Sequence, residues 1–360
     1  MRLPPMPSPG EIVRIYGLSA KRKLAQNFLL DCNVAEKFVR LADPFVENCF
    51  VCEVGPGPGS LTRSILMRNP ARLVVVEKDS RFLPAMKMLR SLRKSGEVRI
   101  VWGDVLKYKM ETAFTGVAKP LPWEARPNTC LISNLPFNIS TPLIIRLMRD
   151  IANRDGLYHY GRAHMVLSFQ KEVAERMMAP VCHAQRSRLS VMVQTYTSIV
   201  DHFLIPGSAF VPAPKVDAAV LKFVPLVTPR LDVPFDDLEM IVRVLFSYRR
   251  ALIRKAARQM FRYDKMIMAE FFQRADVPDN LRPQEVTLDE WGRLCRAYID
   301  MKHLATGIIN FQIDPVDAYN DYYQMNEGDD YSKGEFEPDT VEEEAALKDL
   351  DMSPLITQTL

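Results

Sequence analysis

The feature that most constrains this chain is a turn of three glycines directly after a short apolar run. The run covers residues 50–54, and Gly55, Gly57 and Gly59 follow it at every second position. A helical pattern over residues 61–67 comes next. Glycine has no Cβ, so its backbone can turn tightly and approach a ligand closely, and the first N–H groups of a helix are free to bind one. Strand, glycine turn and helix together predict a nucleotide-binding loop.

Polar residues and glycines also follow the later predicted strands. Glu77 lies 22 residues after Gly55, close to the ~20-residue offset at which an acid reaches a ribose hydroxyl. The strands and the residues after them are 73–76 with Glu77, 98–102 with Gly103 and Asp104, and 129–132 with Ser133 and Asn134. The carboxyl ends of parallel strands meet at one edge of a sheet, where ligands bind. The alternation of strands and helices predicts an α/β fold with a mostly parallel central sheet.

Two further segments complete the predicted domain. A helix is expected over residues 141–150, with Pro142 in its first turn, where proline is favoured. The proline-rich segment 208–216 is expected to be a loop. After Pro234 only helical patterns remain, which indicates a second, smaller all-helical domain. Its four predicted helices cover residues 235–246, 249–262, 265–275 and 287–302.

The overall net charge of +3 hides a strong asymmetry. Residues 312–360 contain 14 acidic and two basic side chains, so the rest of the chain holds 45 basic and 30 acidic residues. Seven basic residues and no acids lie between Arg243 and Arg262. A basic body favours a polyanionic partner such as nucleic acid. The acidic tail is expected to be disordered or loosely docked, and our hypothesis is that it shields the basic surface.

Composition narrows the class of protein further. No apolar run approaches the ~18 residues of a membrane span. Only one pair of the six cysteines, Cys49 and Cys52, has a CxxC spacing, and a zinc site of this type needs two pairs. We therefore expect no metal site, no membrane partner and reduced structural cysteines.

The segment Asn134-Leu135-Pro136-Phe137 fits methyl transfer to the exocyclic amine of a base. The lone pair of such an amine is conjugated into the ring, so the amine is a poor nucleophile. The Asn134 amide oxygen and the Leu135 carbonyl can accept its two hydrogens and orient the lone pair, in a turn that Pro136 stiffens. Phe137 can stack on a base that has left its helix.

Six segments, in this order, resemble the motif set of the ribosomal RNA adenine dimethyltransferases. They are Gln26–Leu29, Glu53–Gly59, Glu77–Asp79, Gly103–Val105, Asn134–Phe137 and Phe210–Asp217. The resemblance extends from about residue 18 to residue 302. The sequence of residues 29–31, 140–145, 169–176 and 185–191 is similar to the mitochondrial members of this family.

The resemblance implies an enzyme that uses S-adenosylmethionine to dimethylate two adjacent adenines in the 3′-terminal hairpin loop of mitochondrial small-subunit rRNA, and so supports small-subunit assembly. It implies that the catalytic site consists of Asn134, Leu135, Pro136, Phe137 and Phe210, with the two phenylalanines around the target base. Cofactor contacts are implied for Gln26, Asn27, Leu29, Glu53, Gly55, Gly57, Gly59, Glu77, Lys78, Gly103, Asp104, Val105 and Asn134. Glu77 would bind the ribose hydroxyls, and Lys78, Asp104 and Val105 would frame the adenine.

The same resemblance suggests how the chain is divided. Residues 1–20 would be an N-terminal extension, 21–232 a Rossmann-like methyltransferase domain, 233–305 a helical RNA-binding domain and 306–360 the acidic tail. The predicted RNA-binding residues are Lys21, Arg22, Lys23, Arg249, Arg250, Arg254, Lys255 and Arg258. A location in the mitochondrial matrix follows from the resemblance alone.

Three alternatives stay open on the sequence. The glycine turn and Glu77 permit an NAD-dependent dehydrogenase, although no His/Asp or Tyr/Lys catalytic set follows them. A DNA adenine methyltransferase usually differs at the position of Leu135. A factor that binds nucleic acid in transcription or ribosome assembly without catalysis is the strongest alternative, but its catalytic turn would be expected to show damage, and here Asn134–Phe137 is intact. Partnership with the mitochondrial transcription machinery therefore also stays open.

Overall fold

The computed structural model describes residues 8–21, 26–91, 97–261 and 264–302. All described residues belong to one compact unit. The predicted acidic tail and the basic residues Arg22 and Lys23 lie outside the described ranges.

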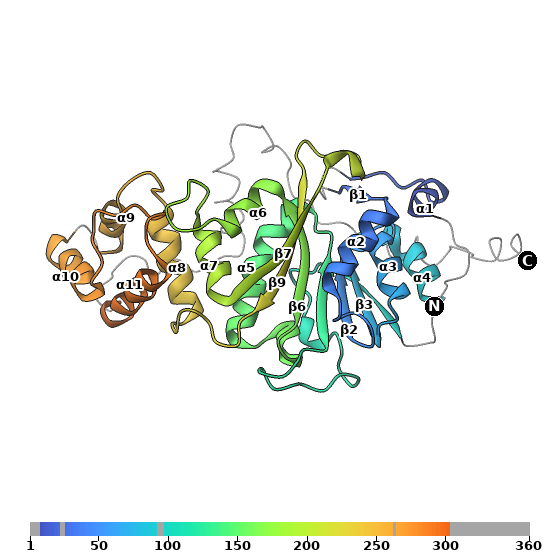
Figure 1. Ribbon diagram of the computed structural model, residues 1–360, viewed down its shortest axis with the longest axis horizontal. Helices are drawn as coiled ribbons and strands as arrows, with labels where there is room; N and C mark the ends of the chain where they lie inside the picture. Colours follow the sequence, from blue (N-terminus) through green and yellow to red (C-terminus); the bar gives the residue numbers. More distant parts are fainter. Residues whose placement is uncertain (1–7, 22–25, 92–96, 262–263, 303–360) are drawn as a thin grey trace, which may run out of the picture. The chain divides into compact units, whose positions relative to one another are not determined.

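A seven-stranded sheet forms the centre of the described unit (Figure 1). Its spatial order is β4-β3-β2-β5-β6-β9-β7, in which neighbouring strands from β4 to β6 run parallel and β9 runs antiparallel to both of its neighbours. The strands are β2 Phe50–Val54, β3 Arg72–Glu77, β4 Val98–Trp102, β5 Thr129–Ser133, β6 His164–Gln170, β7 Thr197–Ile205 and β9 Ala218–Pro225. This confirms the predicted α/β fold with a mostly parallel sheet.

The strand order reverses next to β2, since β3 lies on one side of it and β5, much later in the chain, on the other. In open α/β sheets the loops at such a reversal part and leave a crevice beyond the carboxyl ends of the strands. Gly55 follows β2 directly and Asn134 follows β5 directly. The sheet topology therefore places the glycine turn and the Asn134–Phe137 turn at the same edge.

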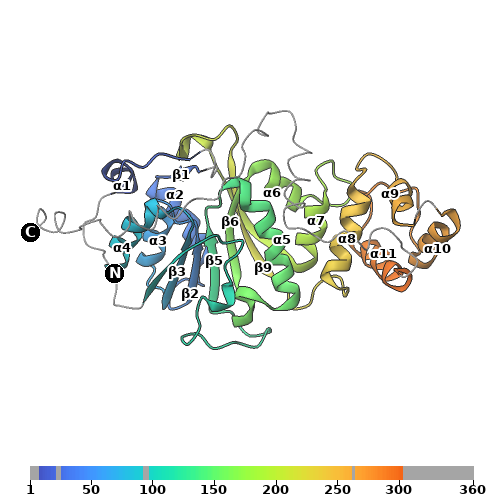
Figure 2. The same cartoon turned by 180° about the vertical axis from the view of Figure 1, so that it is seen from behind.

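Helices cover both faces of the sheet, as Figures 1 and 2 show from opposite sides. One face packs against α2 Cys32–Ala42, α3 Ser60–Met67 and α4 Leu83–Ser91, and the other against α5 Phe137–Asn153, α6 Lys171–Met178 and α7 Arg188–Tyr196. A short helix α1, Pro9–Ile15, precedes them, and β1 Phe28–Leu29 pairs antiparallel with β8 Phe210–Val211 in a separate two-stranded sheet. Asp31 caps α2, because its side chain accepts hydrogen bonds from the N–H groups of Asn33 and Val34.

Successive side chains along the buried strands point to opposite faces of the sheet and so belong to two separate core clusters. Val51 contributes to the cluster under α2 and α3, whereas Cys52 contributes to the cluster under α5 and α7. Leu73 and Val74 divide in the same way on the next strand. Successive side chains of a strand point to opposite faces, so a sheet with both faces covered needs continuous apolar runs. The apolar residues 50–54 and 73–76 meet this requirement.

Four further helices follow the sheet and agree with the all-helical prediction. They are α8 Phe235–Phe246, α9 Ile253–Met260, α10 Lys265–Ala275 and α11 Leu288–Met301. Their apolar side chains, including the buried Trp291, join the same cluster as α5 and α7. Trp291 stacks on Phe246 at 5.5 Å between ring centroids. The basic segment of the sequence falls on α9 and on the turn before it.

Two predicted boundaries near the pocket were wrong, and the predicted helix 249–262 begins only at Ile253, after a turn over residues 247–250. Helix α5 begins at Phe137, and Pro142 lies inside it rather than in its first turn; the proline removes one hydrogen bond near the helix start, which the packed helix tolerates. Segment 208–216 is not only a loop, because Phe210 and Val211 form a strand with Leu29 and Phe28. A two-residue strand that pairs with distant residues has no local sequence signal.

The glycine turn allows a stability test. Gly59 has φ +89°, and an added Cβ would lie 2.6 Å from Leu89 Cδ1, whereas at Gly116, with φ +76°, it would meet nothing within 4 Å. We expect Gly59→Ala to lower the free energy of unfolding by roughly 2–4 kcal/mol, from backbone strain plus overpacking. Gly116→Ala should cost only the strain, roughly 1–2 kcal/mol. Urea denaturation measures both, and equal costs would contradict the close packing of Gly59 on α4.

Candidate active site

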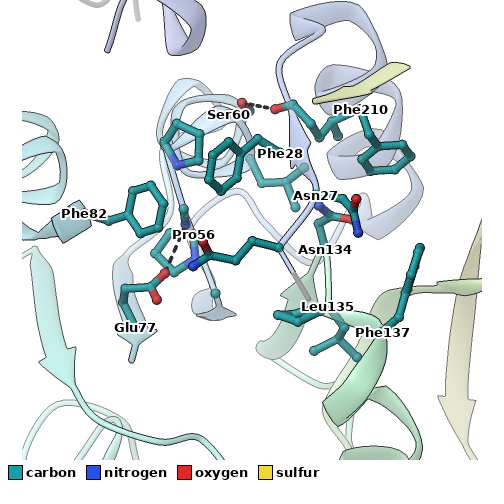
Figure 3. Close-up of a pocket in the computed structure, with 17 residues that line it drawn as sticks. Asn27, Phe28, Pro56, Ser60, Glu77, Phe82, Asn134, Leu135, Phe137 and Phe210 are labelled. Atoms are coloured by element: carbon teal, nitrogen blue, oxygen red, sulfur yellow. Dashed lines mark hydrogen bonds between the residues drawn. The ribbon is translucent and has the colours of Figure 1, made fainter. Parts of the chain in front are cut away.

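A pocket opens at the carboxyl edge of β2 and β5 (Figure 3). It brings together residues from five parts of the chain: the region of β1, the glycine turn, the end of β3 and the helix after it, the turn after β5, and β8. The lining residues are Gln26, Asn27, Phe28, Leu29, Gly55, Pro56, Gly57, Pro58, Ser60, Leu61, Glu77, Phe82, Asn134, Leu135, Pro136, Phe137 and Phe210. The predicted catalytic residues all line it, together with seven of the predicted cofactor residues.

The glycine turn has the geometry that its sequence predicts. Gly55 and Gly57 adopt φ +63° and +53°, in the left-handed region, and a Cβ at Gly57 would point into open space. The Gly55 N–H donates to the Val76 carbonyl at 2.9 Å and ties the turn to β3. Gly59 occupies the N-cap position of α3 and does not line the pocket. Two glycines therefore face the pocket, and the third permits close packing behind it.

Glu77 is an almost fully buried carboxyl group on the pocket wall, 6% exposed. Its two oxygens accept hydrogen bonds from the backbone N–H groups of Gly57 at 3.2 Å and Asp79 at 2.8 Å. Burial raises the pKa of Glu77 to about 7, although these N–H groups pull it down. The carboxyl group thus holds the glycine turn in place and keeps acceptor capacity toward the pocket.

Glu53 lies one layer further inside and does not line the pocket. It is completely buried on β2, and burial raises the pKa of its carboxyl to about 8, with the Glu77 charge adding to the rise. The remaining predicted cofactor residues flank the pocket. Lys78 Nζ lies 3.3 Å from Asp104 Oδ2, and the Gly103 N–H donates to the Glu77 carbonyl at 2.8 Å.

The loop after β4 is fastened to helix α5. Arg146 donates to the carbonyl oxygens of Val105 and Tyr108, each at 2.7 Å, and Val105 is buried. Asp104 and Val105 therefore sit at the end of β4 beside Glu77 at the end of β3, as predicted for neighbouring parallel strands.

A hydrogen-bonded group holds the segment that precedes β1 against the pocket. Gln26 donates to Asp79 at 2.9 Å, and Arg81 binds both Asp79 and the Gln26 side-chain oxygen. Arg81 also donates to the Ser19 carbonyl at 3.1 Å. Burial raises the pKa of Asp79, but the hydrogen bonds from Arg81 and Gln26 outweigh it and leave the pKa below its usual value. An ionised Asp79 thus anchors Gln26 at the pocket.

The turn after β5 presents Asn134 to the pocket. Ser168, fully buried on β6, donates to Asn134 Oδ1 at 2.8 Å and accepts from the Leu135 N–H at 3.0 Å. Pro136 lies against the glycine turn, since a Cβ on Gly55 would come 3.7 Å from its Cδ. The two turns at the reversal of strand order are therefore in direct contact.

Two aromatic rings lie on either side of Asn134 in Figure 3. Phe137 opens helix α5, and Phe210 comes from β8, more than seventy residues later. Pairing of β8 with β1 sets Phe210 opposite Leu29 in register. The two-stranded sheet is what brings Phe210 to the pocket, and this explains how two phenylalanines so far apart in sequence can face one ligand.

The predicted RNA-binding residues that the structure describes are exposed. They are Lys21, Arg249, Arg250, Arg254, Lys255 and Arg258. Lys255 Nζ lies 4.9 Å from the Tyr248 ring centroid, and Arg254 pairs with Asp279 at 3.7 Å. Burial and the nearby cations Arg176 and Arg250 lower the pKa of Arg249. Arg176, Arg249 and Arg250 therefore lie close enough to repel one another.

Metal and membrane features are both missing from the described residues. No group of three or more His, Cys, Asp or Glu side chains there is arranged to hold a metal ion. Over the same residues, no helix has both the length and the apolar character needed to span a membrane.

Comparison with known proteins identifies the family. Residues 17–292 match the ribosomal RNA adenine dimethylase family. The chain belongs to this family. It is 45% identical over 303 residues to mitochondrial dimethyladenosine transferase 1 of Xenopus tropicalis, covering 83% of this chain and 87% of the relative, and the human protein of that name gives the same values. The crystal structure of a dimethyladenosine transferase from Plasmodium falciparum shares the fold, with TM-score 0.56 at 21% identity, covering 76% of this chain and 97% of that one.

The family membership confirms the predicted activity, cofactor and location. The chain is an rRNA adenine N6,N6-dimethyltransferase, its methyl donor is S-adenosylmethionine, and its location is mitochondrial by resemblance to these relatives. The pocket fits such a cofactor. Open space faces Gly57, and a buried carboxyl group stands on the same wall. When bound, S-adenosylmethionine supplies an electrophilic methyl group.

Sequence reasoning missed some residues of the site. Phe28 and Phe82 line the pocket and meet edge to face at 5.4 Å between centroids. Pro56, Pro58, Ser60 and Leu61 also line it. Ser168 does not line it but touches Asn134. Ser168 had no local sequence signal, because it meets Asn134 only through the pairing of β5 with β6.

The raised pKa of Glu77 makes stability depend on pH. Its pKa is about 7 in the folded protein against an ordinary value of 4.5, so the folded state holds the proton more tightly and loses stability as pH rises from 4.5 through 7. Between pH 5.5 and 8.5 the free energy of unfolding of the wild type should therefore fall by about 2 kcal/mol more than that of Glu77→Gln. Denaturant titration at both pH values measures it. Glu124→Gln, at an exposed carboxylate, is the control and should lose as much stability over this pH range as the wild type. If Glu77→Gln also lost as much as the wild type, the raised pKa would not belong to Glu77.

Proposed function

We propose that this enzyme dimethylates two adjacent adenines in the 3′-terminal hairpin loop of mitochondrial small-subunit rRNA and so supports assembly of the small subunit. The observation that supports this best is the shared pocket, in which Asn134 stands between Phe137 and Phe210 and the glycine turn forms the opposite part of the lining. A flipped-out base and a nucleoside-bearing methyl donor can both reach such a pocket.

We propose these roles for the cofactor side of the pocket. Gly55, Gly57 and Leu29 surround the amino-acid end of the cofactor, and Glu77 accepts hydrogen bonds from its ribose hydroxyls. Lys78, Asp104 and Val105 frame its adenine. Gln26, Asn27, Glu53, Gly59 and Gly103 support these contacts from the surrounding turns. Glu77 suits its role because a diol hydroxyl can donate to a carboxylate that already accepts two N–H groups.

On the target side, the protein orients an amine. Asn134 Oδ1 has one lone pair engaged by Ser168 and a second free to accept a hydrogen of the target amine. The Leu135 carbonyl accepts the other hydrogen, so that the nitrogen lone pair turns away from the ring. Phe137 and Phe210 hold the base by stacking. Orientation of a poor nucleophile is the main contribution that this geometry offers.

We also propose the division of the chain into a methyltransferase domain, residues 21–232, and a helical RNA-binding domain, residues 233–305. The exposed cations Arg249, Arg250, Arg254, Lys255 and Arg258 would bind phosphates of the rRNA. Lys21, in the segment before β1, would contact the RNA at a separate place, since β1 and α9 lie toward opposite ends of the molecule (Figure 1). The same cations would serve binding to the mitochondrial transcription machinery and its DNA, and this role remains the alternative.

The decisive test is methyl transfer from labelled S-adenosylmethionine to a small-subunit rRNA hairpin with adjacent loop adenines. We expect the wild type to add two methyl groups to each of the two adenines. Asn134→Ala should lower kcat at least ~100-fold, because the amine loses an orienting acceptor, while hairpin binding is retained. The control is Asn153→Ala, at an exposed asparagine at the end of α5. A wild type that binds hairpin and cofactor but transfers no methyl group would favour the non-catalytic alternative.

Salt dependence tests the proposed RNA surface. The double variant Arg250→Ala/Arg258→Ala should bind the hairpin more weakly, and the slope of log affinity against log salt should fall by roughly one for each arginine. Arg274→Ala is the control, since this exposed arginine of α10 already pairs with Glu270 at 2.5 Å. An unchanged slope in the double variant would show that the phosphates bind elsewhere.

A further inference from the structure

Ser168 lies beneath the proposed reaction centre and has no role in the motifs that define it. Its side chain is fully buried and does not line the pocket. The last parallel pair between β5 and β6 joins Ser133 to Leu167, so the next residues, Asn134 and Ser168, come side by side. The register of the sheet thus places the Ser168 hydroxyl next to Asn134, whose side chain is proposed to orient the amine.

In each of the two hydrogen bonds of Ser168, the donor and the acceptor are fixed. The Leu135 N–H can only donate, and it occupies a lone pair of Ser168 Oγ at 3.0 Å. The hydroxyl hydrogen is then directed to Asn134 Oδ1 at 2.8 Å. If the amide were turned over, its NH₂ group could only donate to the second lone pair of Ser168 Oγ, and the buried hydroxyl hydrogen would lose its acceptor. The backbone N–H of Leu135 therefore selects, through Ser168, which atom of the Asn134 amide is the oxygen.

We infer that Ser168 is a positioning residue, which fixes the Asn134 amide so that its oxygen is oriented to accept a hydrogen of the target amine. The inference rests on the proposed role of Asn134. A terminal amide torsion is broad and roughly two-fold, so an asparagine side chain has little intrinsic preference between its two orientations. One buried hydroxyl that is itself held by a backbone N–H removes this freedom before the substrate binds.

This role predicts a separation of kinetic constants. Ser168→Ala should lower kcat about tenfold, which corresponds to about 1.4 kcal/mol, because part of the Asn134 population presents NH₂ to the amine. The affinities for the hairpin and for S-adenosylhomocysteine should change less than about twofold, because Ser168 does not line the pocket.

Two further variants distinguish orientation from packing. Ser168→Thr keeps the hydroxyl and should retain kcat, whereas Ser168→Cys fills the volume with a weak donor and should behave like Ser168→Ala. Thr195→Val is the matched control, since Thr195 is equally buried and its hydroxyl donates to the Val191 carbonyl at 2.8 Å, away from the pocket. A cysteine variant with full kcat, or an alanine variant with unchanged kcat, would overturn the inference.

A second measurement does not depend on activity. With asparagine labelled by ¹⁵N, the side-chain NH₂ signals of Asn134 are assigned by their absence in Asn134→Ala. In Ser168→Ala these signals should move toward those of a freely rotating amide, and in Ser168→Thr they should stay. Unmoved signals in Ser168→Ala would reject the inference even if the wild type transferred no methyl group, an outcome that would reject the proposed function separately.

Discussion

The structure depends on the close contact between two turns at the point where the order of parallel strands reverses. β2 and β5 are neighbours in the sheet although about eighty residues separate them, so the glycine turn and the Asn134 turn leave the same edge. Pro136 comes within van der Waals reach of Gly55. A different strand order would separate the two turns. The pocket exists because the glycine turn and the Asn134 turn meet at one edge of the sheet.

The buried carboxyl group of Glu77 gives the pocket wall its electrostatic character, and Glu53 is buried behind it. Glu53 and Glu77 both lie on strands under the glycine turn, and burial raises the pKa of each. Such groups oppose folding as they ionise, and the surrounding apolar clusters must offset that cost. The exposed cations of α9 and the turn before it have the opposite sign. The molecule thus pairs an acidic interior wall, suited to hydroxyl donors, with a basic surface suited to phosphates.

The sequence predicted those parts of the fold and site that rest on local patterns. Continuous apolar runs predicted β2 and β3, and glycine spacing predicted the turn after β2. Features that depend on long-range pairing had no such signal. Phe210 reaches the pocket only because β8 pairs with β1, and Ser168 reaches Asn134 only through the register of β5 and β6. The start of α5 was misjudged because Pro142 is usually a sign of a first turn, whereas here the packed helix accepts it inside.

The small sheet of β1 and β8 has a consequence for how the two substrates communicate. Leu29 borders the proposed cofactor side and Phe210 the proposed base side, and backbone hydrogen bonds hold them in register. Segments paired in this way shift as one body, so a change at one is felt at the other. Because such coupling is reciprocal, whatever a bound cofactor does to the affinity for RNA, bound RNA does equally to the affinity for the cofactor. These four residues of extended chain join the proposed cofactor side of the pocket to the proposed base side.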